Sequence, residues 1–334
     1  MLEKVVHLQI EHSLVIQEDP GGQACYPELE QKHSRSYINL VRTKSERLKE
    51  NQNEIDKQND AYFSKDTFAS AKLATDACLT ALAKILDNNC PHNVGFCNVR
   101  PPGHHAKHDH YAGFSFFNSV ALAAQKAASQ GKRVLIFDWD VHHGDGTQTM
   151  FYDSDQVLFM SLHRFDDGTF YPRNGIGAPS CTGEGKGAFH NVNCAWNTGL
   201  VVNEDDREDN QVSELGCNEY KHACDEVLFP IARRFEPDII LISAGFDAAI
   251  HDPLGWSKLC PLMFYHMTRE LMKICPKVLA VLEGGYNPDY LGQHASGVVK
   301  ALLGVPEESY GEPTQADRDA GFTRLSQIRG EDAV

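Results

Sequence analysis

The stretch FDWDVHHGDGTQ, residues 137 to 148, directly follows the apolar run VLI at 134 to 136. Apolar residues in near-continuous order are typical of a strand that is covered on both faces, as in a parallel sheet. Polar side chains gather where this strand ends: Asp138, Asp140, His142, His143 and Asp145. In open α/β folds, ligands bind beyond the carboxyl ends of the strands, so the stretch predicts a parallel sheet with a site at its edge.

Strand-like and helical segments alternate along the rest of the chain. Further apolar segments of strand length lie at residues 94–99, 156–163, 238–245 and 277–285. Helical patterns lie at 67–86, 117–130, 219–235 and 261–274. This alternation predicts one α/β domain over residues 1–334, with helices flanking a central sheet. We also expect an exposed helix at 44–58 and a solvated acidic loop at 203–216.

The composition excludes several classes of protein. Of the 334 residues, 42% are apolar and 23% are charged, which is ordinary for a compact globular enzyme. The net charge of −15 disfavours a nucleic acid as a direct partner. The ten cysteines form no C-x-x-C pair, so we expect reduced thiols in an intracellular protein. The chain has no apolar run of about 18 residues and no signal-peptide core, so we expect neither secretion nor a membrane span.

Loops rich in reactive side chains follow several of the predicted strands. Besides the opening stretch, SAGFDAAIHDPLG (243–255) and LEGGYN (282–287) lie at the ends of two strands. A further loop, RPPGHHAKHDHYAGFSFFN (100–118), brings His104 and His105 near Phe114. Because the carboxyl ends of parallel strands meet at one edge of a sheet, we expect these loops to converge.

Asp140 and His142 have the spacing of a metal-binding pair. Residues i and i+2 of an extended segment point to the same side, so both side chains can reach one ion. Zn²⁺ accepts oxygen and nitrogen ligands and keeps an open position in catalytic sites. Asp247, in a Gly-flanked turn after the strand at 238–245, is the best candidate for a third ligand. Taken alone, an Asp-x-His pair is more often a capped turn, and the combination of loops favours a metal site.

Six motifs, in order, resemble those of one family. They are RPPGHHA (100–106), GFSFFNS (113–119), DWDVHHGDGTQ (138–148), SLHRFDDGTFYP (161–172), SAGFDAA with DPLG (243–255) and LEGGYN (282–287). The set is similar to the zinc-dependent histone deacetylases, specifically class II. The resemblance runs from about His33 to about Leu303 and implies the arginase/deacetylase fold, with a central, mostly parallel eight-stranded sheet flanked by helices. Ahead of His33 we do not recognise the family's opening strand or its His-Pro-Glu loop.

The resemblance implies a role for each matching residue in the hydrolysis of an amide. The second tandem histidine would be the general base and then the general acid, while the first would act as its electrostatic partner. The implied set comprises the zinc ligands Asp140, His142 and Asp247, the tandem histidines His104 and His105 with their respective carboxylate partners Asp138 and Asp145, and the oxyanion donor Tyr286.

The resemblance also implies a narrow channel around the acyl-lysine side chain and an inner potassium site. Phe114 and Tyr171 would flank the channel, and Tyr171 stands where the family often has phenylalanine. The other implied positions are Gly113, whose carbonyl would accept the amide N–H, Asp60 at the rim, which would accept hydrogen bonds from the substrate backbone, Leu254 at a gatekeeper position, and Asp138, Ser161 and Leu162, which with the carbonyls of Asp140 and His142 would hold K⁺.

The implied substrates are acetyl-lysine side chains of histones, tubulin or other proteins, in the nucleus and/or the cytoplasm, and hydroxamate-type inhibitors would bind the zinc. Three alternatives are an acetylpolyamine amidohydrolase, a weakly active acetyl-lysine-binding scaffold and a manganese-dependent ureohydrolase. Polyamine-selective relatives carry glutamate at the position of Leu254, which here leaves a second cation without a partner. An intact Tyr286 argues against the scaffold, and a ureohydrolase would need further metal-binding acids.

Overall fold

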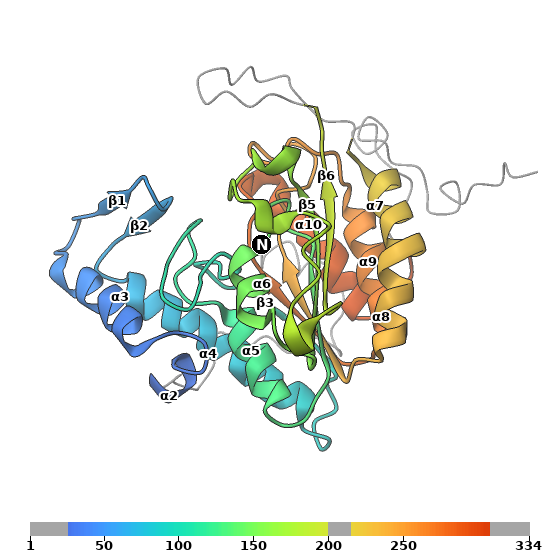
Figure 1. Cartoon of the computed structure of the whole chain (residues 1–334), viewed down its shortest axis with the longest axis horizontal. Coiled ribbons are helices and arrows are strands. Elements are labelled where there is room, and N and C mark those ends of the chain that lie inside the picture. Colours follow the sequence, from blue (N-terminus) through green and yellow to red (C-terminus); the bar gives the residue numbers. More distant parts are fainter. Residues whose placement is uncertain (1–25, 200–214, 308–334) are drawn as a thin grey trace, which may run out of the picture.

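The structure of the chain, a computed structural model, describes residues 26–199 and 215–307 (Figure 1). The acidic loop expected at 203–216 lies almost entirely outside the described residues, and so do residues 1–25 and 308–334. Within the described ranges, no helix is both long enough and apolar enough to cross a membrane.

A parallel sheet forms the centre of the described chain, as expected. Its spatial order is β3-β8-β7-β4-β5-β6, and every neighbouring pair is parallel. The sheet has six strands within the described ranges rather than the expected eight, and two further short strands pair with each other in a separate antiparallel hairpin. The strands of the sheet are β3 (Val94–Cys97), β4 (Val134–Asp138), β5 (Val157–Arg164), β6 (Asn191–Trp196), β7 (Ile239–Ala244) and β8 (Val278–Leu282).

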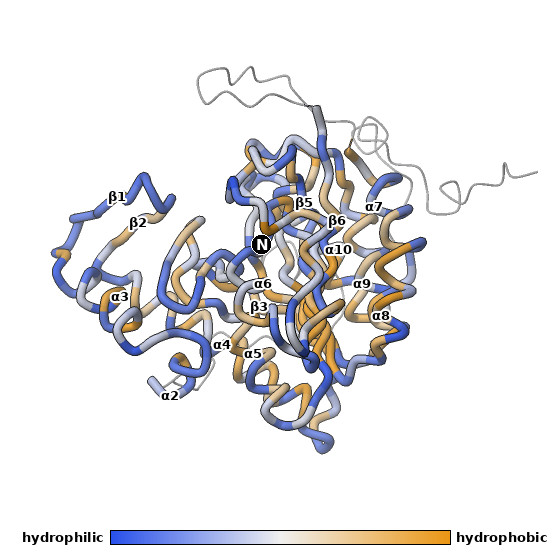
Figure 2. Tube along the Cα trace, viewed as in Figure 1, coloured by the Kyte–Doolittle hydropathy of each residue, from blue (hydrophilic) through white to orange (hydrophobic). Residues whose placement is uncertain are grey.

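Burial on both faces explains the continuous apolar runs in the central strands. In β4, Leu135 and Phe137 pack into one hydrophobic cluster, while Val134 and Ile136 pack into another on the opposite face. Because successive side chains of a strand point to opposite faces, each of β4, β5, β7 and β8 supplies both clusters. In Figure 2 the tube is largely orange, the hydrophobic end of the scale, in the interior around the sheet.

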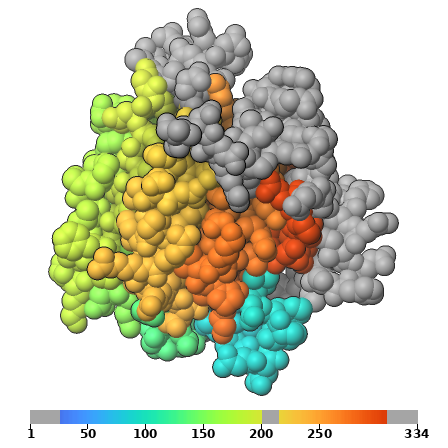
Figure 3. All heavy atoms as spheres, turned by 90° about the vertical axis from the view of Figure 1, so that its right-hand side faces the viewer, coloured from blue at the N-terminus to red at the C-terminus, as the bar shows by residue number. Residues whose placement is uncertain are grey.

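Helices cover both faces of the sheet (Figure 1). The helices α4 (Thr67–Leu86), α5 (Ser119–Ala128) and α6 (Asp145–Phe151) contribute to the cluster around Val134. The opposite face is covered by α7 (Cys217–Ala223), η4 (Cys224–Leu228), α8 (Phe229–Phe235), α9 (Pro261–Ile274) and α10 (Pro288–Leu302). In Figure 3, residues of this second layer form one continuous yellow-to-red surface. Short 3-10 turns follow β5 at η1 (Asp166–Gly168), η2 (Gly175–Gly177) and η3 (Gly185–Gly187).

A third hydrophobic cluster holds the N-terminal part of the described chain. It joins α2 (Tyr26–Leu29), α3 (Arg35–Arg47) and the hairpin of β1 (Glu54–Asp56) and β2 (Ala61–Phe63) to Tyr111 and Phe116. The prediction of an exposed helix at 44–58 is wrong. The helix ends at Arg47, and residues 54–56 form a strand because Phe63 of β2 is buried in the third cluster and brings its antiparallel partner with it.

The strand order has a switch point between β4 and β7. From β4 the chain proceeds to β5 and β6 on one side, and then returns to β7 on the other side of β4. At a switch point the connections leave the sheet in opposite directions and open a crevice beyond the carboxyl ends. The loop after β4 carries Asp140 and His142, and the loop after β7 carries Asp247.

Candidate active site

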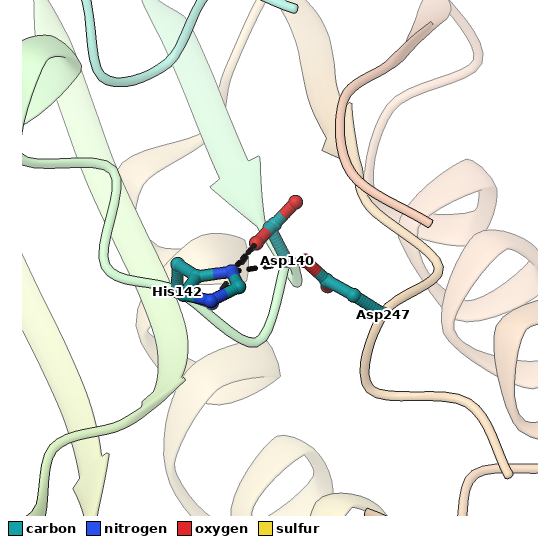
Figure 4. Close-up of side chains that lie close together, drawn as sticks. All are labelled: Asp140, His142 and Asp247. Atoms are coloured by element: carbon teal, nitrogen blue, oxygen red, sulfur yellow. Dashed lines mark hydrogen bonds and ion pairs between the residues drawn. The ribbon is translucent and has the colours of Figure 1, made fainter. Parts of the chain in front are cut away.

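The side chains of Asp140, His142 and Asp247 lie close together beyond the carboxyl ends of β4 and β7, as Figure 4 shows. One ligand atom from each residue lies within 4.8 Å of the others, and all three residues are buried. His142 Nδ1 is 3.1 Å from Asp140 Oδ1 and 3.0 Å from Asp247 Oδ2. The backbone N–H of Val141 donates to Asp247 Oδ1 at 2.8 Å and so fixes the second carboxylate. Among residues 26–199 and 215–307, this is the one group of three or more such side chains that could hold a metal ion.

The surroundings of the cluster fit a bound cation. A Cβ atom at Gly284 would lie 2.4 Å from Asp247 Oδ2 and 2.6 Å from Asp140 Oδ2, so glycine leaves these oxygens free of side-chain obstruction. Burial and the neighbouring Asp140 carboxylate raise the pKa of Asp247, because two negative charges repel each other in a site shielded from water. A divalent cation would relieve this repulsion, and two oxygens with one nitrogen suit an open catalytic site.

Two histidine–carboxylate pairs lie beside the metal cluster. His104 Nδ1 is 3.0 Å from Asp138 Oδ2, and His105 Nδ1 is 2.8 Å from Asp145 Oδ1. All four side chains are buried, and the two imidazole rings lie 4.0 Å apart. In each pair the carboxylate fixes the ring orientation, which leaves Nε2 as the nitrogen that can act on a substrate.

The two imidazoles differ in basicity. Burial disfavours the charged form of His104, but the carboxylates of Asp140 and Asp138 outweigh it and hold the His104 pKa well above its usual value. Burial and the neighbouring His104 charge lower the pKa of His105 to about 4, against the opposing effect of Asp145. At neutral pH the arrangement therefore pairs a cationic His104 with a neutral His105 that can accept a proton.

Three residues that our sequence analysis did not single out hold this machinery in place. Lys107 Nζ lies 2.8 Å from Asp145 Oδ2, the oxygen that His105 does not use. Glu283 Oε2 accepts the backbone N–H groups of Gly103 at 2.7 Å and of His104 at 3.1 Å. Asn174 Nδ2 donates to Asp145 Oδ2 at 3.3 Å. Lys107 and Glu283 lie within the motif loops that we had identified, but only the folded chain shows their partners.

Tyr286 follows β8 and is tied to the loop after β7. Its backbone N–H donates to Asp252 Oδ2 at 2.7 Å, and Asp252 also accepts the N–H of Leu254 at 2.9 Å. Burial and the carboxylates of Asp247 and Asp140 raise the pKa of the Tyr286 hydroxyl well above its usual value. The hydroxyl therefore stays protonated and can act as a hydrogen-bond donor near the metal cluster.

Aromatic rings surround the approach to the cluster. The Tyr171 ring contacts His105 and His142 edge-on, with ring centroids 5.0 Å and 5.9 Å away. The rings of Phe114 and Tyr286 also meet edge-to-face, at 5.9 Å. Position 113, next to Phe114, requires glycine. Its φ is +50°, and a Cβ atom there would lie 2.3 Å from His105 Cδ2.

The hairpin of β1 and β2 supports this approach from the rim. The carbonyls of Asn59 and Asp60 accept the N–H groups of Gly113 at 3.1 Å and Phe114 at 2.8 Å. Asp60 itself is exposed, and its carboxylate contributes to the raised pKa of the Tyr171 hydroxyl after the larger effects of burial and Asp145. The carboxylate of Asp60 is therefore close enough to the Tyr171 hydroxyl to act on it electrostatically.

The positions expected around an inner potassium ion lie on adjacent strands. Asp138 at the end of β4 lies directly opposite Ser161 in β5, and Leu162 is the next residue of β5 after Ser161. The side chains of Ser161 and Asp138 also have protein partners. Ser161 Oγ lies 2.9 Å from His163 Nδ1, and Asp138 Oδ1 accepts the Asp140 N–H at 3.1 Å.

The fold and the site together define an α/β protein with a candidate metal-dependent catalytic centre. A family model described as the histone deacetylase domain matches residues 3–302, and so begins well ahead of His33. Histone deacetylase HDA1 of Saccharomyces cerevisiae is 35% identical over 300 residues, which are 88% of this chain and 40% of that protein. Polyamine deacetylase HDAC10 of Danio rerio is 38% identical over 291 residues, which are 86% of this chain and 41% of that protein.

A solved structure, that of the HDA15 HD domain, superposes with a TM-score of 0.76 at 35% identity, and the match covers 90% of this chain and 77% of that one. The chain belongs to the zinc-dependent histone deacetylase family. The expected family and the arginase/deacetylase fold are confirmed, and the likeness to HDA1 fits the class II branch. The chain spans about two fifths of the length of the two curated relatives.

Proposed function

We propose that the chain is a zinc-dependent lysine deacetylase that hydrolyses the amide of Nε-acetyl-lysine in histone and/or non-histone proteins, and thereby regulates chromatin and transcription. The observation that carries the proposal is the convergence of the metal cluster, both histidine–carboxylate pairs and Tyr286 on one crevice. Release of acetate from an acetyl-lysine peptide, measured together with the zinc content of the protein, tests it. No turnover with one zinc ion bound per chain would contradict it.

Asp140, His142 and Asp247 would hold the zinc ion. Zn²⁺ bound there would polarise the amide carbonyl as a Lewis acid and lower the pKa of a coordinated water. The chain's own residues then handle the protons. His105, which is neutral at physiological pH, would accept a proton from the attacking water and deliver it to the leaving lysine amine, with Asp145 fixing its tautomer. The cationic His104 would stabilise the charge that develops beside it.

Tyr286 would donate its hydroxyl hydrogen to the carbonyl oxygen as that oxygen becomes negative. Phe114 and Tyr171 would exclude water along the lysine side chain, the Gly113 carbonyl would accept the amide N–H, and Asp60 would accept hydrogen bonds from the substrate backbone. We also propose a K⁺ ion near Asp138, Ser161 and Leu162, where the carboxyl end of β4 pairs with the middle of β5.

Hydroxamate-type inhibitors would bind through the metal, since a hydroxamate presents two oxygens to a cation with an open position. A place in the nucleus and/or the cytoplasm is supported by the family and by the cysteines, all of which are free thiols within the described residues.

The first prediction separates protein lysine from polyamine substrates, the choice that the two curated relatives leave open. Leu254 offers no charge to a second ammonium group, so we expect acetyl-lysine peptides to be hydrolysed with a higher kcat/KM than N8-acetylspermidine. Leu254→Glu should move that ratio toward the polyamine by about tenfold, the effect of one added charge pair of roughly 1.4 kcal/mol. Leu254→Gln is the uncharged control. Higher kcat/KM for acetylspermidine in the unmutated enzyme would favour the polyamine alternative.

A second prediction concerns Lys107. Its ion pair with Asp145 Oδ2 holds the carboxylate that orients His105, so Lys107→Met should lower kcat by about tenfold with little change in KM. Lys107→Arg should restore most of the loss, because it keeps the charge. Lys65→Met is a matched control, since Lys65 is 37% exposed against 33% for Lys107 and pairs with Glu50 and Asp66. An unchanged kcat in Lys107→Met would show that Asp145 is held by its other partners.

A further inference from the structure

Two buried thiols meet outside the catalytic crevice. Cys217, the first residue of α7, and Cys260, the residue before α9, have their sulfur atoms 3.2 Å apart. Only 5% of Cys217 and 3% of Cys260 is exposed, and both are free thiols. The two residues are distant in sequence, and their sulfurs need to approach by only about one further ångström to reach the 2.05 Å of a disulfide bond.

The surroundings of Cys217 favour its reactive form. Its sulfur accepts the backbone N–H of Cys260 at 3.3 Å, which adds to the contact with the Cys260 thiol. The thiol contact, together with this N–H, outweighs burial and lowers the pKa of Cys217. A thiolate is the form of cysteine that attacks an oxidant, and a second thiol at contact distance can resolve the product.

We propose that Cys217 and Cys260 form a modification site for hydrogen peroxide, at which the two thiols are oxidised to an intramolecular disulfide. The Cys217 thiolate attacks one peroxide oxygen and breaks the O–O bond, which gives a sulfenic acid and, after protonation, one water. The Cys260 thiol then displaces the hydroxyl as a second water and closes the S–S bond. The pair loses two electrons and two protons, and one hydrogen peroxide becomes two waters.

The disulfide would fasten a loop that carries active-site residues. The chain between Asp247 and Cys260 already pairs with the residue before α7 at Gly216↔Lys258, and its own two ends pair at Ala249↔Leu259. It also carries Asp252, which holds the Tyr286 backbone. A covalent link from Cys260 to the start of α7 closes a long chain loop and restricts the unfolded state, so the oxidised protein should unfold at a higher temperature.

Peptide mapping of the full chain tests this proposal. After treatment with hydrogen peroxide, alkylation of free thiols and trypsin digestion, mass spectrometry should find Glu208–Lys221 joined to Leu259–Arg269, each of which contains one cysteine. Dithiothreitol should separate the two peptides. The oxidised protein should show a rise in unfolding midpoint on the order of 5 °C over the reduced protein.

Variants show whether the link is specific. Cys217→Ser and Cys260→Ser should each abolish both the joined peptide and the rise in midpoint, whereas Cys90→Ser should keep both. The mapping of the unmutated chain stands even if a serine variant fails to fold. The proposal is overturned if both peptides remain alkylated, or if Cys217 is found as a sulfinic acid without the link, at a peroxide dose that oxidises Cys90.

Discussion

Tyr286→Phe is expected to lower kcat for an acetyl-lysine peptide by about 10²- to 10³-fold, the usual effect of removing one oxyanion donor. The substitution deletes one hydroxyl and keeps the ring, so the edge-to-face contact with Phe114 remains. The backbone hydrogen bond from residue 286 to Asp252 is also independent of the side chain. Zinc content, thermal stability and KM should therefore stay near those of the unmutated protein, which places the whole effect on the chemical step.

Tyr290→Phe is the matched control for this prediction. Tyr290 lies in α10, is 37% exposed and packs against His251, so loss of its hydroxyl should leave kcat unchanged. Tyr286→His offers a further comparison, because an imidazole is shorter than a phenol and should not reach the same oxygen. If Tyr286→Phe turned over at a near-normal rate, another group would have to stabilise the oxyanion, and the cationic His104 would be the first to examine.

The metal cluster could be predicted from the sequence because its members follow strands with strong apolar patterns. Asp140 and His142 stand two residues apart after β4, so their common side follows from local geometry alone. Asp247 required one more step, the adjacency of β4 and β7, which the sequence alone does not show. The sequence led us to expect that the loops after the strands converge, and the pairing of β4 with β7 confirms this for the loops that carry Asp140 and Asp247.

Two elements, β6 and α10, were not predicted from the sequence, because β6 is partly polar and α10 contains glycines. The strand β6 contains Asn191 and Asn193, and asparagine is more typical of loops than of strands. In the folded chain the side-chain amides of both residues donate to Gln148 Oε1. Helix α10 contains Gly292 and Gly297, which lower its helical propensity. Glycine is needed at 297 because a Cβ there would lie 2.3 Å from the Pro261 carbonyl of α9. In both cases tertiary contacts decide the local structure.

Supporting residues of the site were missed for a related reason. Lys107, two residues after His105, resembles any solvated lysine in the sequence, and only the fold brings it to Oδ2 of Asp145, the oxygen that His105 does not contact. Glu283 precedes the glycines of the LEGGYN motif and reaches across the crevice to the backbone before His105. Such contacts join segments that are distant in sequence, and no local pattern predicts them.

Asp247→Asn is expected to lose most of the bound zinc and at least about 10³-fold in activity. The variant is isosteric, and its side-chain oxygen can still accept the Val141 N–H, so the loop after β7 should keep its fold. What changes is the charge: an amide oxygen is a weaker ligand than a carboxylate, and a metal that supplies several kcal/mol to the transition state is lost with it. Zinc per chain, measured by mass spectrometry of the native protein, is the direct readout.

Asp76→Asn provides the control for a buried carboxylate. Asp76 is 3% exposed, lies in α4 and pairs with Lys72, so its substitution perturbs a buried charge without touching the metal cluster. It should keep one zinc per chain and normal turnover. An Asp247→Asn protein that also retained one zinc per chain would remove Asp247 from the ligand set, whereas loss of zinc with an unchanged unfolding midpoint of the metal-free protein would locate the effect in coordination and not in the fold.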